Sequence, residues 1–169
     1  MGEESAAIRD ALDRAIAAFD APPKSLSFAP TIEPTDTNSA VVRLRTACRL
    51  LTACRSLREP SGYHASVIEL SFAAIEHSLA AVAHSRGETL AKADTGRATT
   101  LARAGDLGLI SETTATQLRQ LHHDNRTHTR TRGTAAAAQH ATAMFELAVA
   151  VHTHVVDTAV LSHECTCEA

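Results

Sequence analysis

The sequence has few aromatic residues and no tryptophan, since phenylalanine and tyrosine together make up only 3% of its 169 residues. Sheets depend on aromatic and β-branched side chains, so a sheet-built core is disfavoured. The strict alternation of apolar and polar residues that is typical of a half-buried strand is also missing. Because apolar residues still make up 44% of the chain, the sequence favours an all-α bundle of closely packed helices.

An excess of basic charge is also lacking, because the formal net charge is -3 and the isoelectric point is near 6.3. This balance argues against nucleic-acid binding by the whole surface, although a local basic patch stays open. No run approaches the roughly 20 apolar residues that span a bilayer. The first twenty residues contain acids instead of a basic and then apolar signal, so we expect a cytoplasmic protein without membrane contact.

Cysteine is sparse, with Cys48 and Cys54 in one segment and Cys165 and Cys167 at the end of the chain. This placement does not indicate a disulfide framework, so we expect reduced thiols. Thiolates and imidazoles suit zinc, and the histidines near the end of the chain are His152, His154 and His163. The Cys-x-Cys spacing is not that of a structural zinc site, and we therefore predict no metal and no cofactor.

Helical periodicity is clearest over residues 63–85, where the apolar positions follow steps of four, three, four and three: Ile68, Phe72, Ile75, Leu79 and Val82. Gly87 is the expected cap after this helix. Weaker patterns predict further helices, which give five or six in all: 5–20, 39–59, 89–104, 111–125 and 135–161. The expected organisation is an N-terminal helix with a proline-rich connector (1–38), a helical bundle (39–164) and a tail (165–169).

One local positive field stands out, because residues 119–133 contain four arginines and three histidines against the single acid Asp124. On a helix, one face can hold Arg119, His122, His123 and Arg126, and Arg130 and Arg132 follow it. The arginines of this set are the candidate phosphate ligands. Arginine binds phosphate bidentately, and histidine transfers protons near neutral pH. The pattern suits metal-independent cleavage of RNA. The alternative is a solvated helix end whose cations complement the helix dipole.

Two further charged sets have ordinary interpretations. Glu69 and Glu76 are seven residues apart and could face the basic segment, but a solvated face is favoured because glutamate is seldom buried unless paired. The arginines between Arg43 and Arg58 could bind nucleic acid, but we interpret them mainly as a soluble helix face.

Several features from Ser39 onward resemble the HEPN superfamily. They are a helix that contains a tyrosine, a Gly-Leu-Ile turn, and a helix that runs into Asn125-Arg126 before a long final helix. In the first of these, the similar residues are Tyr63, His64, Ala65, Ile68, Glu69, Phe72, Ala73, Ala74 and Glu76. The resemblance implies a bundle that is usually dimeric. It also implies, for many members, a metal-independent endoribonuclease or toxin with a nucleotidyltransferase-like antitoxin as partner.

The active motif of that superfamily is an arginine followed, after four to six residues, by a histidine. Arg126 matches the arginine and Asn125 the polar residue often beside it, but Thr131, Arg132 and Gly133 occupy the histidine positions. The resemblance therefore implies a degenerate site. In it Arg126 would hold phosphate, His123 or His128 would transfer protons, and further residues would bind RNA or nucleotide: Arg119, Asn125, Arg130 and Arg132. The alternative is a non-catalytic dimeric module for protein interaction.

Overall fold

The computed structural model describes residues 14, 16–17, 36–59, 62–92, 94–128 and 133–159, with the side chains of residues 36–38 and 128 excepted. The chain divides into two compact units, Met1–Glu33 and Pro34–Ala169. In the first unit the described residues are helical and exposed: Arg14, Ile16 and Ala17. The rest of the helix predicted over 5–20 lies outside the described residues.

The second unit contains five helices, and no strand occurs among its described residues. In chain order these are α2 (Asp36–Arg58), α3 (His64–Ser85), α4 (Arg97–Asp106), α5 (Glu112–His128) and α6 (Thr134–Thr158). The predicted all-helical class is confirmed, and so is the helix expected over 63–85.

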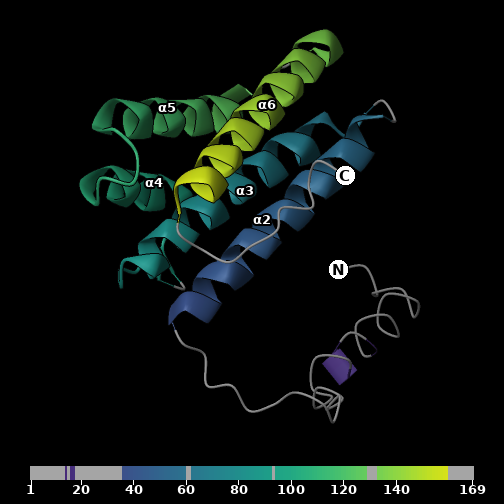
Figure 1. Cartoon of the computed structure of the whole chain (residues 1–169). Coiled ribbons are helices and arrows are strands. Elements are labelled where there is room, and N and C mark those ends of the chain that lie inside the picture. Colours follow the sequence, from purple (N-terminus) through teal and green to yellow (C-terminus); the bar gives the residue numbers. More distant parts are fainter. Residues whose placement is uncertain are drawn as a thin grey trace, which may run out of the picture. The chain divides into compact units, whose positions relative to one another are not determined.

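Helix α3 is the centre of the bundle, with α2 and α6 packed against it and against each other (Figure 1). Its buried residues include Phe72, Ile75 and Leu79, and the small residues Ala74, Ala81 and Ala83 are also buried. Small side chains let neighbouring helices approach closely, which explains how a core without tryptophan is filled. By length and composition α3 could also cross a membrane, but more than half of its apolar window is buried, as is typical of a central bundle helix.

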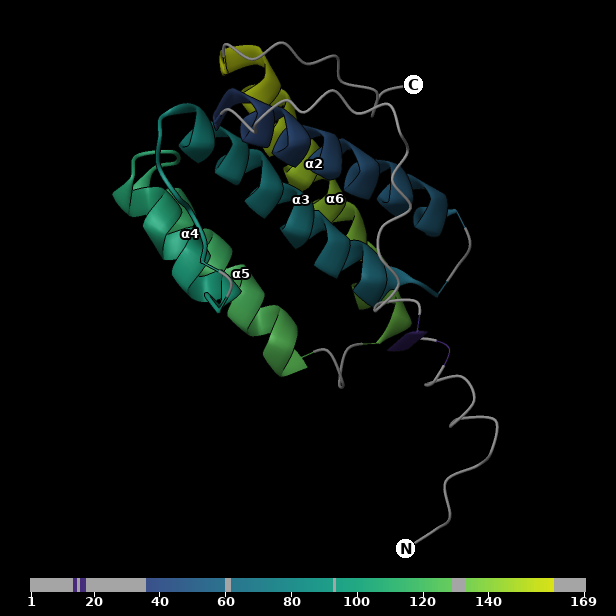
Figure 2. The same ribbon diagram turned by 90° about the horizontal axis from the view of Figure 1, so that it is seen from below.

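Helices α4 and α5 form a hairpin that lies along one side of α3, and two views at right angles show this arrangement (Figures 1 and 2). The two helices of the hairpin pack closely at Gly105, where an added Cβ atom would lie 2.9 Å from the Cβ of Ala115. Only glycine fits there without a shift of the neighbouring helix. Its turn uses Gly108 at a φ of 64°, which glycine adopts without strain. Ser111 Oγ accepts a hydrogen bond of 3.0 Å from the backbone N–H of Thr114 and so caps the start of α5, in agreement with the helix start predicted at residue 111.

The helix predicted over 89–104 was wrong at its start, because α4 begins only at Arg97. The preceding residues are not helical, and there the backbone N–H of Lys92 donates to Thr95 Oγ1 at 3.1 Å. Leu90 is nevertheless a core residue, although it lies outside any helix. Helix α5 continues to His128, almost one turn beyond the predicted end at Asn125.

A buried polar cluster joins the three packed helices. His152 of α6 lies with Nδ1 2.9 Å from Ser78 Oγ of α3 and with Nε2 3.2 Å from Cys48 Sγ of α2. A neutral imidazole can satisfy both contacts, because one ring nitrogen donates and the other accepts. His152 therefore belongs to the core, whereas the residues that might have formed a zinc site with it lie outside the described residues: His163, Cys165 and Cys167.

The two described cysteines, Cys48 and Cys54, are buried and form no disulfide within the described part of the chain. Burial raises the pKa of the Cys54 thiol, and this effect outweighs the opposing hydrogen bond from Ser71 and the charge of Arg58. A thiol held in its protonated form is a poor nucleophile. Cys54 is therefore a packing residue. Its Sγ atom lies 3.7 Å from the backbone carbonyl oxygen of Val67.

Candidate functional site

An ion cluster joins α3 to the α4–α5 hairpin. Arg97 Nη1 lies 2.6 Å from Glu69 Oε2, and Arg97 Nε lies 3.1 Å from Glu76 Oε2. Asn125 Nδ2 donates to the other Glu69 oxygen, Oε1, at 2.9 Å. The favoured interpretation of a solvated face holds in part for Glu69, whose side chain is 51% exposed, and fails for Glu76, which is 22% exposed. Both glutamates bind the hairpin that carries the basic segment.

Arg97 was not recognised from the sequence, because its partners lie on another helix. Its guanidinium group lies 5.0 Å from the centre of the Phe72 ring, within range of a cation–π contact. Burial by itself would lower the pKa of Arg97, but the hydrogen bonds and charges of Glu69 and Glu76 together raise it above its ordinary value. Arg97 is therefore a permanent cation, engaged by two carboxylates.

His122 lies at the inner edge of this cluster. Its ring meets Phe72 edge to face with 5.5 Å between ring centres, and Nδ1 is buried with no hydrogen-bond partner among the described residues. Burial lowers the pKa of His122, the charges of Arg97 and Arg126 lower it further, and Glu69 opposes them. The imidazole is therefore neutral at pH 7 and faces inward.

This lowered pKa predicts that acid destabilises the fold. Unfolded His122 takes up a proton near its ordinary pKa of about 6.5, whereas the folded form takes it up only at lower pH. The contribution of neutral His122 to the free energy of unfolding is thus present above about pH 6.5 and is lost as the pH falls below that value. Urea unfolding at pH 7.5 and 5.5 measures how much free energy of unfolding is lost between the two pH values. We expect this loss to be smaller for His122→Gln than for the wild type. His154→Gln, on an exposed face of α6, is the control, and equal losses in all three proteins would contradict the prediction.

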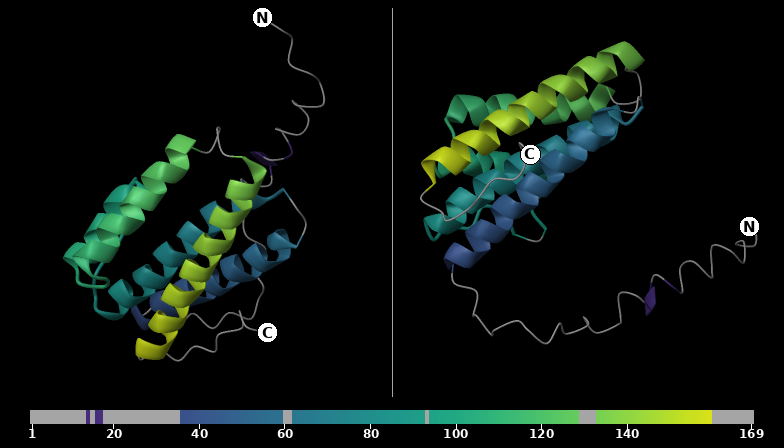
Figure 3. Two further views of the ribbon diagram at one scale, coloured as in Figure 1. Left: turned by 90° about the horizontal axis from the view of Figure 1, so that it is seen from above. Right: turned by 45° about the vertical axis from the view of Figure 1, so that its right-hand side comes forward.

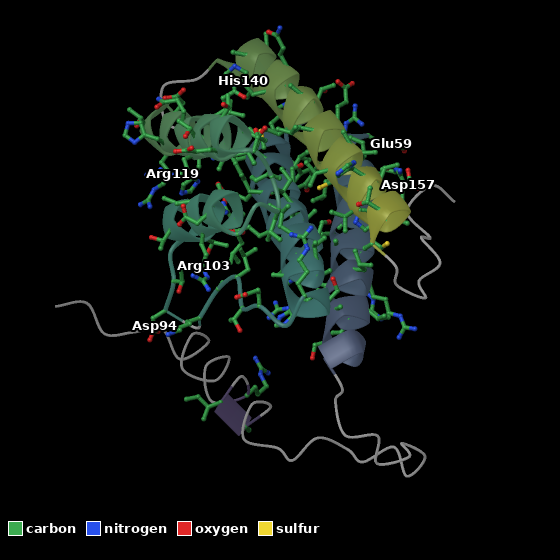
Figure 4. All side chains as sticks on the ribbon, turned by 60° about the vertical axis from the view of Figure 1, so that its left-hand side comes forward. Glu59, Asp94, Arg103, Arg119, His140 and Asp157 are labelled. Atoms are coloured by element: carbon green, nitrogen blue, oxygen red, sulfur yellow. The ribbon has the colours of Figure 1, made fainter. Side chains whose placement is uncertain are left out.

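The outer side of α5 carries three exposed residues spaced by four and three: Arg119, His123 and Arg126. We call these three residues the α5 ridge. Among the described residues neither arginine forms an ion pair, and the adjacent Asp124 accepts a hydrogen bond from Gln120. Figure 4 shows Arg119 on the outer side of its helix. The ridge is therefore an exposed cationic surface with no carboxylate paired to it.

The remaining candidates from the basic segment are placed differently. Asn125 is buried and turned toward Glu69, as described above. His128 is the last residue of α5, and its side chain is not described. Arg130 and Arg132 lie outside the described residues. The structure thus brings together Arg119, His123 and Arg126, and it turns Asn125 inward.

An apolar groove of about 280 Å³ lies beside Asn125, between α3, α5 and α6. Its lining includes Phe72, Leu121, Met144 and Leu147, and Leu121 is 43% exposed. The sequence did not reveal this groove, because three helices far apart in the chain contribute to it. No three histidine, cysteine, aspartate or glutamate side chains gather as a metal site within the described parts of the chain.

Comparison with known proteins gives one match. No curated protein and no solved structure matches the chain. A family model described as a domain of unknown function, DUF8154, matches residues 3–167, which is nearly the whole sequence. The chain therefore belongs to the DUF8154 family.

Proposed function

We propose that this domain binds RNA or nucleotide phosphate through the α5 ridge. The observation that supports the proposal is the exposed line of Arg119, His123 and Arg126, in which neither arginine has an ion pair among the described residues. Arginine offers a planar fork of donors that fits phosphate, and an unpaired arginine keeps these donors free for a ligand.

The ion cluster beneath the ridge supports the same proposal, because it fixes how α5 is rotated. Successive residues of a helix point about 100° apart, since 3.6 residues complete one turn. Asn125 is held inward by Glu69, and the neighbouring Arg126 is exposed. Glu69 and Asn125 are therefore positioning residues for the ridge.

The proposal includes metal-independent cleavage of RNA as an activity of this site. His123 lies between the two arginines of the ridge, where it could take the proton from a ribose 2′-hydroxyl. Arg126 would stabilise the charge that develops on the phosphate. The resemblance to HEPN domains extends this proposal to a dimeric, toxin-type protein with a degenerate motif and a nucleotidyltransferase-like antitoxin.

The test is binding and cleavage of a short, fluorescently labelled single-stranded RNA in the presence of a chelator. We expect Arg126→Ala to weaken binding about tenfold or more, and to reduce the slope of log affinity against log salt by about one, because one phosphate contact is lost. Arg103→Ala on α4 is the matched control, since Arg103 is also exposed but is paired at 3.8 Å with Glu88. Fluorescence anisotropy at several salt concentrations measures both quantities.

The cleavage arm compares the wild type with His123→Ala and His128→Ala on the same RNA. Loss of cleavage in either variant, with binding retained, would assign proton transfer to that histidine. RNA affinity that is unchanged in Arg126→Ala would contradict the whole proposal.

A second candidate function is a non-catalytic dimeric interaction module, and the apolar groove favours it. Leu121 both lines the groove and is largely exposed, so a second copy related by a two-fold axis could place its own Leu121 in the same region. A dimer in sedimentation equilibrium together with no RNA binding would favour this candidate. A monomer that binds RNA through the α5 ridge would exclude it.

A further inference from the structure

A second concave surface lies on the other side of α6 from the groove, and nothing described above uses it. This hollow of about 480 Å³ is bounded by the end of α2, the start of α3 and the first half of α6. Its lining includes Arg55, Arg58, Glu59, His64, Thr142 and Phe145. We call it the α2–α6 hollow. None of its lining residues lines the apolar groove.

Two guanidinium groups converge in this hollow on one aromatic ring. The Cζ atoms of Arg58 and Arg55 lie 4.6 and 5.8 Å from the centre of the buried Phe145 ring. A guanidinium group that stacks on a ring keeps its N–H edges free to donate. Within the described residues neither arginine has an ion pair, and Glu59 is the single acid in the lining. The hollow therefore holds two guanidinium groups over one ring, with His64 in the lining.

The helix dipole alone does not account for this arrangement. Cations in the last turn of a helix complement its negative end, and this applies to Arg55 and Arg58 of α2. The dipole requires neither a ring beneath both groups nor a hollow in front of them. Arg45 and Arg49 on the same helix are exposed and have no such ring contact among the described residues. They provide an internal comparison for the converging pair.

We propose that the α2–α6 hollow binds a phosphorylated small molecule of mononucleotide size. Its volume falls within the range of about 300–1,000 Å³ that is usual for small-molecule sites. The guanidinium groups of Arg55 and Arg58 suit phosphate oxygens, and the partly exposed lining residues His64, Ala138 and Thr142 can contact the organic part of the ligand. The α5 ridge is a convex helix face that suits a polymer, whereas the hollow is an open concave surface bounded by three helices and suits a compact ligand.

The two surfaces are also separate in space, because Glu59 and Arg119 lie on opposite sides of α6 in Figure 4. The further views in Figure 3 show the α4–α5 hairpin on one side of α6 and α2 on the other. Binding in the hollow and binding on the ridge can therefore be tested independently.

The experiment is isothermal titration of the full chain with AMP, UMP, inorganic phosphate and adenosine. We expect both mononucleotides to bind, inorganic phosphate to compete with them weakly, and uncharged adenosine to bind at least tenfold more weakly than AMP. Arg55→Gln/Arg58→Gln should weaken AMP binding at least tenfold. Arg45→Gln/Arg49→Gln removes the same charge from the same helix and should change AMP affinity less than twofold.

Three results would overturn the proposal: no mononucleotide binding by the wild type, equal AMP affinity in the Arg55→Gln/Arg58→Gln variant, or equal affinity for AMP and adenosine. If the double variant unfolds, as judged by circular dichroism, the single variant Arg58→Gln decides, because Arg58 is exposed. Arg126→Ala separates this site from the ridge. Loss of AMP binding in that variant would assign the nucleotide to the ridge and overturn the proposal for the hollow.

Discussion

Replacing Arg97 with alanine is expected to lower the free energy of unfolding by about 2–3 kcal/mol, because two carboxylates would lose their cation. The side chains of Arg97 and Glu76 are 19% and 22% exposed, and that of Glu69 is 51% exposed. Breaking a fully buried pair costs about 3–5 kcal/mol, so the partial exposure of this cluster places the expected loss below that range. The cation–π contact with Phe72 is lost as well.

Urea unfolding followed by circular dichroism measures this effect. The control is Arg103→Ala, which breaks a pair at 3.8 Å between side chains that are both about half exposed. Such surface pairs contribute about 0–1 kcal/mol. Arg97→Lys keeps the positive charge but not the planar guanidinium group. Its loss of unfolding free energy should fall between those of Arg97→Ala and Arg103→Ala. Equal stability of Arg97→Ala and Arg103→Ala would show that the cluster does not hold the hairpin on α3.

Phe72→Ala should destabilise the protein still more, by about 3–5 kcal/mol, which is the usual cost of removing a buried phenylalanine ring. Phe72 lies in the core, contacts His122 at its edge and lies beneath Arg97. Single domains are stable by only about 5–15 kcal/mol, so the variant could lose a large part of its stability.

The same variant gives a second readout that simple loss of packing would not. Burial is the main reason for the lowered pKa of His122. If Phe72→Ala stays folded, opening this site should raise the pKa of His122 toward its ordinary value, as measured by an NMR titration of the ring protons. Phe72→Leu keeps most of the apolar volume and should cost less than half as much. An unchanged His122 pKa in the alanine variant would show that Phe72 does not shield it.

The helices with regular apolar spacing could be predicted from the sequence. The steps over Ile68, Phe72 and Ile75 predicted α3 to within one residue, and Ser111 predicted the start of α5, because periodicity and capping are local. The start of α4 could not be predicted. Leu90 looks like a helical residue in the sequence, but it is a core residue of a non-helical segment before Gly96.

The candidate site was predictable only where helix geometry alone decides it. The spacing of Arg119, His123 and Arg126 already predicted a shared face on α5. The sequence also placed His122 on that face, whereas the structure turns it toward Phe72. Which side of α5 meets α3 depends on Glu69 and Arg97, and both lie on other helices. That information is tertiary, and no local pattern contains it.

The buried contacts of His152 also bear on which of several alternative packings the chain adopts. The packed face of α6 combines the small residues Ala141 and Ala148 with the larger Met144 and Phe145, so apolar packing already favours one register. A slide of one turn would move His152 by about 5.4 Å, away from both Ser78 and Cys48. Each polar group left buried without a partner would cost about 1–3 kcal/mol. The three residues thus add a penalty on sliding to the register that apolar packing favours.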